Sequence, residues 1–178
     1  MNSITHRRLS LAIVLLSWGS VGVALFTQHR LGMEPCPWCI AQRLLYLLCG
    51  AMALLAAWPS SRSYAGRLVA SLFLALTALS ALATVVTALY QHLVAAATGS
   101  CAITAVDRFL MYTGLSDWQP EIFEPRASCA EADQSLMNLP YSLWSAALAV
   151  LLLVLACLTI RMLWRSRSGQ AVRGKMSD

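Results

Sequence analysis

Two cysteines and an arginine at the start of an apolar run have types and spacing suited to redox chemistry. Cys36 and Cys39 are three residues apart, and Arg43 follows Cys39 by four positions. If a helix begins near Pro37, Cys39 lies in its first turn, where the helix dipole and free N–H groups favour a thiolate. Arg43 then lies on the same helix face and can place a positive charge near that sulfur or near a bound anion. The pattern predicts a thiol–disulfide redox site.

The elements that must position these residues are apolar helices. The 178 residues are 58% hydrophobic and 12% charged, with a mean hydropathy of +0.64, which is typical of a membrane protein. The first apolar run is longer than a signal-peptide core, which favours a retained span. We predict an all-α membrane protein, a four-transmembrane-helix bundle with two periplasmic loops. The single membrane domain, 1–178, has spans at approximately 9–27, 40–58, 68–90 and 141–161, loops at 28–39 and 91–140, and a tail at 162–178.

The basic residues indicate how these spans are oriented. Of 13 Lys and Arg, nine lie before the first span, between the second and third, or after the fourth, whereas residues 91–140 hold six acidic and two basic residues. Because cytoplasmic segments are enriched in Lys and Arg, we expect cytoplasmic termini and two loops that face outward. The net charge of +5 follows from this topology, and no basic patch for nucleic acid is visible. Arg43 lies at the edge of the second span, where its side chain can snorkel to the interface.

Four of the six cysteines fall on the outer side, namely Cys36, Cys39, Cys101 and Cys129. Structural disulfides would explain Cys101 and Cys129 well, because a bridge would restrain the long loop. They explain Cys36 and Cys39 poorly, since so small a ring restrains little chain. A C-x-x-C motif at a helix N-terminus favours disulfide exchange instead.

A redox site in a membrane protein requires an electron acceptor. The sequence has no flavin or dinucleotide motif, whereas a quinone dissolved in the bilayer needs only a groove at the right depth. Cys39 and Arg43 suit such a groove, and Arg43 would stabilise charge on a quinone oxygen. His92, at the outer end of the third span, is either a donor to a bound head group or an interfacial residue without a role. The alternative is a non-enzymatic metal- or haem-binding protein, with zinc on the four thiolates or haem between His29 and His92.

The rest of the chain offers fewer chemical signals. Residues 91–140 form a long loop without a strong helical or strand pattern, and loops of that kind are often functional. Two apolar islands, residues 109–112 and Trp118 with Ile122-Phe123, either lie on the membrane surface as a short amphipathic helix or contact a partner. Cys49 and Cys157 lie inside apolar spans without polar neighbours, so we expect both to be structural thiols.

The ordered set of motifs closely resembles the DsbB family, the disulfide bond formation protein B family of the bacterial inner membrane. The resemblance covers all four spans and both loops. It rests on these motifs: Pro35-Cys36-Pro37-Trp38-Cys39 with Arg43, Tyr90-Gln91-His92, Cys101, Trp118-Gln119-Pro120 and Cys129-Ala130-Glu131. It implies an enzyme of the inner membrane, a protein dithiol:quinone oxidoreductase that generates disulfides.

The resemblance also implies a role for each outer cysteine. Cys101 would form a mixed disulfide with a periplasmic DsbA-like thiol oxidase, and Cys129 would be its partner in the loop. Electrons would then pass to Cys36 and Cys39. These steps would sustain disulfide bond formation by reoxidising the periplasmic protein.

The remaining implications concern the membrane side of the site. Cys39 would interact directly with the quinone, either ubiquinone or menaquinone, with Arg43 and His92 beside it. The partners would be the DsbA-like oxidase, the quinone pool and the lipid bilayer, with no nucleic acid. Position 42 is acidic in some family members, so the role of Gln42 is left open.

Overall fold

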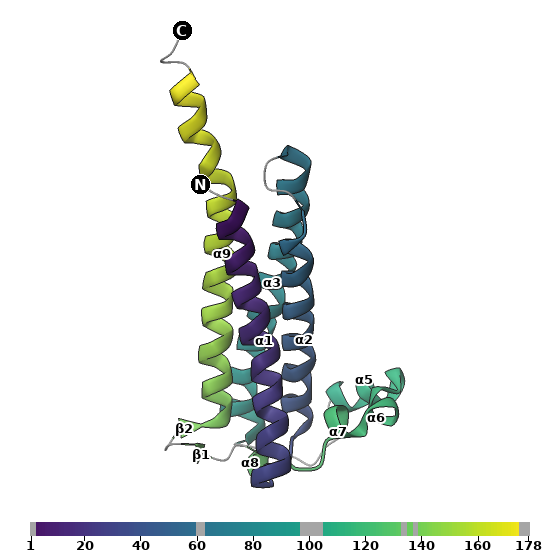
Figure 1. Ribbon diagram of the computed structural model, residues 1–178. Helices are drawn as coiled ribbons and strands as arrows, with labels where there is room; N and C mark the ends of the chain where they lie inside the picture. Colours follow the sequence, from purple (N-terminus) through teal and green to yellow (C-terminus); the bar gives the residue numbers. More distant parts are fainter. Residues whose placement is uncertain (1–2, 60–62, 97–104, 133–134, 137–138, 175–178) are drawn as a thin grey trace.

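Four long helices lying side by side form the body of the molecule (Figure 1). The computed structural model describes residues 3–59, 63–96, 105–132, 135–136 and 139–174. Four helices are long and apolar enough to cross a membrane, so the predicted all-α membrane fold is confirmed. Their bounds are α1 Ser3–Leu31, α2 Pro37–Ala57, α3 Tyr64–Tyr90 and α9 Tyr141–Gly174. The span ranges expected from the sequence lie inside these helices except at residue 58.

Small side chains let these helices approach one another closely. Helices α1 and α3 each pack on both α2 and α9, and many buried positions are alanine, serine or threonine. In lipid, close backbone contact of this kind holds helices together, because burial of apolar surface gives little advantage there. Leucines such as Leu72 and Leu79 remain exposed on the outer faces. The buried positions of α3 recur every three or four residues, at Ala70, Leu74, Thr77, Ala81, Thr84 and Ala88.

The start of α2 is defined by its local sequence. Cys36 is the N-cap residue in an extended conformation (φ −86°, ψ 168°), and proline occupies the first helical position. Proline suits this position because its ring presets φ and the missing N–H would have no helical partner. The helix therefore begins as the sequence predicted, with Cys39 in its first turn. The ring of Trp38 lies 4.8 Å from that of Tyr90, which joins the start of α2 to the end of α3.

The segment between α3 and α9 contains short helices that the sequence pattern did not indicate. They are η1 (Gln91–Ala95, a π-helix), α5 (Ala105–Thr113), α6 (Leu115–Trp118), α7 (Pro120–Phe123) and α8 (Cys129–Ala132), followed by a two-stranded antiparallel ladder of β1 (Ser135–Leu136) and β2 (Leu139–Pro140). Several are single turns, too short for a detectable period. Leu110 and Phe123 pack on Ile40 of α2, which keeps α5 and α7 against the loop end of the bundle (Figure 1). Cys101 lies outside the described residues.

A close contact between α1 and α2 predicts a strong effect on stability. Trp18 donates its indole N–H to the carbonyl of Leu47 at 3.2 Å, and a Cβ added at Gly50 would overlap the indole ring. We expect Gly50→Ala to lower the free energy of unfolding by about 1–3 kcal/mol, the usual cost of overpacking. Thermal unfolding in detergent measures the change. The matched control is Gly22→Ala, because nothing lies within 4 Å of the added carbon, and equal melting of the two variants would contradict the prediction.

Candidate functional site

Three of the four outer cysteines lie together at the loop end of the bundle. The Sγ atoms of Cys36 and Cys39 are 2.8 Å apart, and the backbone N–H of Cys39 donates to Cys36 Sγ at 3.3 Å. Cys36 is also hydrogen-bonded to the side chain of Cys129, which α8 brings against α2. Cys36 thus contacts one sulfur on each side, and a thiol–disulfide exchange step can pass between the second loop and α2 through it.

A capping interaction holds the helix that carries Cys129. Glu131 Oε2 accepts hydrogen bonds from the backbone N–H of Ser128 at 3.0 Å and from its hydroxyl at 2.7 Å. These bonds lower the pKa of the Glu131 carboxyl. The pair forms a capping box, which stabilises the first turn of a helix. It fixes the single turn of α8, and with it the position of Cys129.

The surroundings of Cys36 disfavour its thiolate form. Hydrogen bonds with Cys129 and with Cys39, together with burial, raise the pKa of the Cys36 thiol well above its ordinary value. The side chain is 0% exposed. Cys39 is only half-buried and lines a cavity. The two cysteines of one short motif therefore occupy different chemical environments.

This difference predicts unequal reactivity. We expect Cys36 to be alkylated at least about tenfold more slowly than Cys39 in the reduced protein at pH 7, since the thiolate is the reactive form and Cys36 remains protonated. Limited reaction with iodoacetamide, followed by fragmentation of the peptide 31–43, measures both rates. Equal modification of the two positions would show that the surroundings do not separate them.

Arg43 is buried and held by neutral acceptors. It is 6% exposed, and its Nη1 donates to Gln28 Oε1 at 2.8 Å and to the carbonyl of Ile122 in α7 at 3.2 Å. The loop helix α7 and the end of α1 cover the guanidinium, and the snorkelling expected from the sequence stays a prediction. Among the described residues no salt bridge neutralises it. A buried cation of this kind at membrane depth indicates a functional site.

Gln91 is a site residue that the sequence reasoning missed. Its Nε2 donates to Cys39 Sγ at 3.3 Å, and its Oε1 accepts from Gln42 Nε2 at 2.7 Å. The buried positions of α3 end at Ala88, and one further step of three residues reaches Gln91, which is 1% exposed. This spacing of buried residues along α3 is the sequence signal that could have identified Gln91. His92, predicted beside the cofactor, is half-buried in η1 and is not among the residues that line the cavity.

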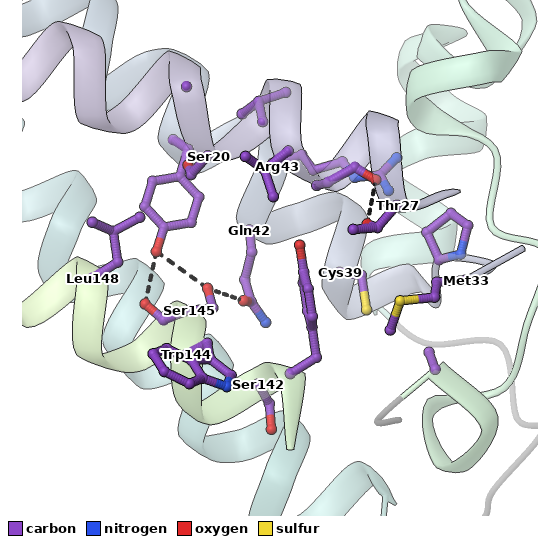
Figure 2. Close-up of a pocket in the computed structure, with 18 of the residues that line it drawn as sticks. Ser20, Thr27, Met33, Cys39, Gln42, Arg43, Ser142, Trp144, Ser145 and Leu148 are labelled. Carbon is purple, nitrogen blue, oxygen red and sulfur yellow. Dashed lines mark hydrogen bonds between the residues drawn. The ribbon is translucent and has the colours of Figure 1, made fainter. Parts of the chain in front are cut away.

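A cavity of about 570 Å³ lies between α1, α2 and α9, next to these side chains. Figure 2 shows Cys39, Gln42 and Arg43 of α2 around it, with Thr27 of α1 and Ser145 of α9. Its volume is typical of a small-molecule site, and such sites combine apolar walls with a few polar groups. Much of the remaining cavity wall consists of apolar side chains from α1 and α9, including Leu15, Leu16, Val23, Trp144 and Leu148.

The fold and the site define a multi-pass membrane protein with two closely spaced cysteines at one end of its helical bundle. The family model described as disulfide bond formation protein DsbB matches residues 6–159. Disulfide bond formation protein B of Ralstonia nicotianae is 32% identical over 162 residues, covering 90% of this chain and 96% of that protein. The protein of the same name from Nitrosomonas europaea is 32% identical over 163 residues, covering 91% and 95%. The chain belongs to the DsbB family.

Family membership bears on the alternative function. A non-enzymatic metal- or haem-binding protein is not favoured, since the relatives carry the name of disulfide bond formation. Among the described residues, no group of three His, Cys, Asp or Glu side chains is arranged to hold a metal ion. His29, considered as a haem ligand, instead contacts Glu121 of α7, with Nε2 and Oε2 2.7 Å apart.

Proposed function

We propose that this protein is a membrane oxidoreductase that reoxidises a periplasmic dithiol oxidase of the DsbA type and passes the electrons to a membrane quinone. The reaction sustains disulfide bond formation. The observation that carries the proposal is the position of Cys36, in contact with both Cys129 and Cys39, where Cys39 in turn lines an apolar cavity. The names of the relatives support the same reaction.

The electron route consists of thiol–disulfide exchanges. A thiolate of the partner attacks Cys101 in a Cys101–Cys129 disulfide, which releases the Cys129 thiolate. The partner's second thiol then displaces Cys101, so that the partner leaves oxidised and both loop cysteines are reduced. Cys129 next attacks Cys36 in the Cys36–Cys39 disulfide, and Cys39 leaves as a thiolate. Cys101 then attacks Cys129, which restores the Cys101–Cys129 disulfide and releases Cys36 as the second thiol of a reduced Cys36–Cys39 pair. Attack at Cys36 agrees with its contact with Cys129.

The cavity beside Cys39 suits a quinone. When bound, a quinone accepts two electrons and two protons and leaves as a quinol. Arg43 offers a fixed positive charge to a ring oxygen, since Gln28 and Ile122 hold its guanidinium in place. The polar contact expected of His92 is assigned here to Gln91, which lies against Cys39. The isoprenoid tail would leave between α1 and α9, along Leu15 and Leu148.

The orientation follows from charge. We place both termini on the cytoplasmic side of the inner membrane and the cysteine-bearing loops in the periplasm, because nine of 13 Lys and Arg residues flank the opposite end. Single cysteines introduced near residue 112 and near residue 176, tested with a membrane-impermeant maleimide on intact cells, check this arrangement. Labelling near 176 without labelling near 112 would reverse it.

The function is tested with the purified protein in detergent. A reduced DsbA-like protein and a soluble ubiquinone or menaquinone analogue are supplied, and quinone absorbance is followed. We expect one quinone consumed for each disulfide formed, and little consumption with Cys101→Ala. The Cys129→Ala variant should accumulate a mixed disulfide between Cys101 and the partner. Absence of quinone consumption together with stoichiometric zinc or haem in the protein would favour the alternative function.

A further inference from the structure

A chain of hydrogen bonds leads from α9 to the sulfur of Cys39. The hydroxyl of Ser145 donates to Gln42 Oε1 at 2.6 Å, and Gln42 Nε2 donates to Gln91 Oε1 at 2.7 Å. Gln91 Nε2 then donates to Cys39 Sγ at 3.3 Å. The chain links α9, α2 and η1 and ends on an atom that the proposed reaction oxidises and reduces.

The far end of the chain is fixed by Tyr46. Its hydroxyl donates to the backbone carbonyl of Ser145 at 2.7 Å and lies 3.2 Å from the Ser145 hydroxyl oxygen. Because the phenol donates its proton to the carbonyl, the Ser145 hydroxyl is free to donate its own proton to Gln42 (Figure 2). Each bond then sets the direction of the next, so the Gln91 amide presents N–H, and not C=O, to Cys39.

Burial keeps the two amides in this network. Gln42 is 5% exposed and Gln91 is 1% exposed. Leaving a buried polar group unpaired is costly, so the partners at the two ends of each amide strongly determine its orientation. An amide free to rotate would turn its oxygen toward the sulfur for part of the time, which disfavours a thiolate.

We propose that Gln42 and Ser145 are positioning residues that aim the Gln91 amide N–H at Cys39, so that the Cys39 thiolate is stabilised when the sulfur carries negative charge. The proposal rests on the function proposed above, since it concerns the cysteine that passes electrons to the quinone. Gln91 touches the reacting sulfur and is the catalytic member of the chain. Hydrogen bonds to a charged group are stronger than those between neutral groups.

The chain makes a specific prediction for a carboxylate at position 42. A glutamate there accepts from Ser145 but, when ionised, has no proton for Gln91 Oε1. The Gln91 amide would turn its NH₂ group toward the carboxylate and its oxygen toward Cys39. Gln42→Glu should therefore behave like Gln42→Leu, although it is polar and nearly the same size.

The test measures alkylation of Cys39 in the full-length, reduced protein, in a Cys36→Ala background where Cys39 is the one cysteine of the peptide 31–43. Iodoacetamide reaction at pH 7 is followed by mass spectrometry. We expect Gln42→Leu, Gln42→Glu and Gln91→Leu to slow the reaction about tenfold, the typical effect of one hydrogen bond to a charged group. Ser145→Thr and Ser145→Val form a matched pair of equal shape, of which Thr should keep the parent rate and Val should lose several-fold.

Each outcome is decisive. Rates for Gln42→Leu equal to the parent, or equal rates for the Thr and Val variants, would overturn the proposal. The differences in alkylation rate between the variants should shrink as the pH approaches about 10, where thiols ionise in every variant. A difference caused by a folding defect would persist at that pH. Because alkylation needs no quinone and no partner, the result is separate from turnover. An inactive parent protein with the expected alkylation pattern would refute the proposed function but not the hydrogen-bonded chain.

Discussion

The Cys39→Ser variant is expected to lose quinone reduction almost completely, with turnover at least about a thousandfold lower, as is typical when a nucleophile is removed. Cys39 is the residue that both contacts Cys36 and lines the cavity. Among the described cysteines, no other one both contacts Cys36 and lies in the cavity wall. Without Cys39, Cys36 retains its contact with Cys129. Cys36 can therefore attack Cys129 in the Cys101–Cys129 disulfide and release the Cys101 thiol, so a Cys36–Cys129 disulfide should accumulate when the partner is absent.

Two measurements check this expectation. Absorbance of a quinone analogue gives turnover, and a non-reducing digest shows whether peptides containing Cys36 and Cys129 are joined. The matched control is Cys49→Ser, since Cys49 is buried in the middle of the bundle and its thiol donates to the Thr77 carbonyl at 3.8 Å. Serine can make that bond, so turnover should be retained. Quinone reduction by Cys39→Ser at a rate near that of the parent protein would remove Cys39 from the electron route.

The second large effect is expected from Arg43→Met. Methionine keeps much of the side-chain volume but removes the charge and the hydrogen bonds to Gln28 and Ile122. Loss of a charge-assisted hydrogen bond to the quinone oxygen should raise the apparent KM for quinone about ten- to a hundredfold. Arg43→Lys should recover only part of the affinity, because a lysine presents a point charge in place of the planar guanidinium.

Steady-state turnover at varied quinone concentration separates this effect from a general loss of activity. The control is Arg30→Met. Arg30 is an exposed arginine at the loop end of α1, and it is not part of the cavity wall. Its KM should remain within about twofold of the parent value, since exposed charges contribute little. If both variants shift KM equally, the effect is one of overall charge and Arg43 has no direct contact.

Local sequence predicted the dithiol and its helix. The C-x-x-C motif with proline after its first cysteine marks a helix start, and the spacing of four places Arg43 on the face of Cys39. Both signals depend on neighbouring residues alone. The predicted membrane fold likewise followed from apolar length, and the structure and the family confirm it.

Long-range contacts were not predictable in this way. Cys36 and Cys129 are separated by about half of the chain, and their contact depends on how α8 packs on α2. Nothing in the sequence of α2 reveals that α7 covers Arg43. Gln91 directly precedes the predicted site residue His92, at the end of α3, where the helix changes to a π-helix. Such π-helical turns shift the register of side chains and often occur at functional sites.

The hydrogen bonds around α7 have a thermodynamic consequence. The carbonyl of Ile122 holds Arg43, and the carbonyl of Glu121 accepts from Gln28, which also holds Arg43. Any protein that binds the second loop and displaces α7 must break these bonds and so alter the affinity of the cavity for its occupant. Linkage is reciprocal, so an occupant of the cavity alters the affinity for the docked protein by the same factor.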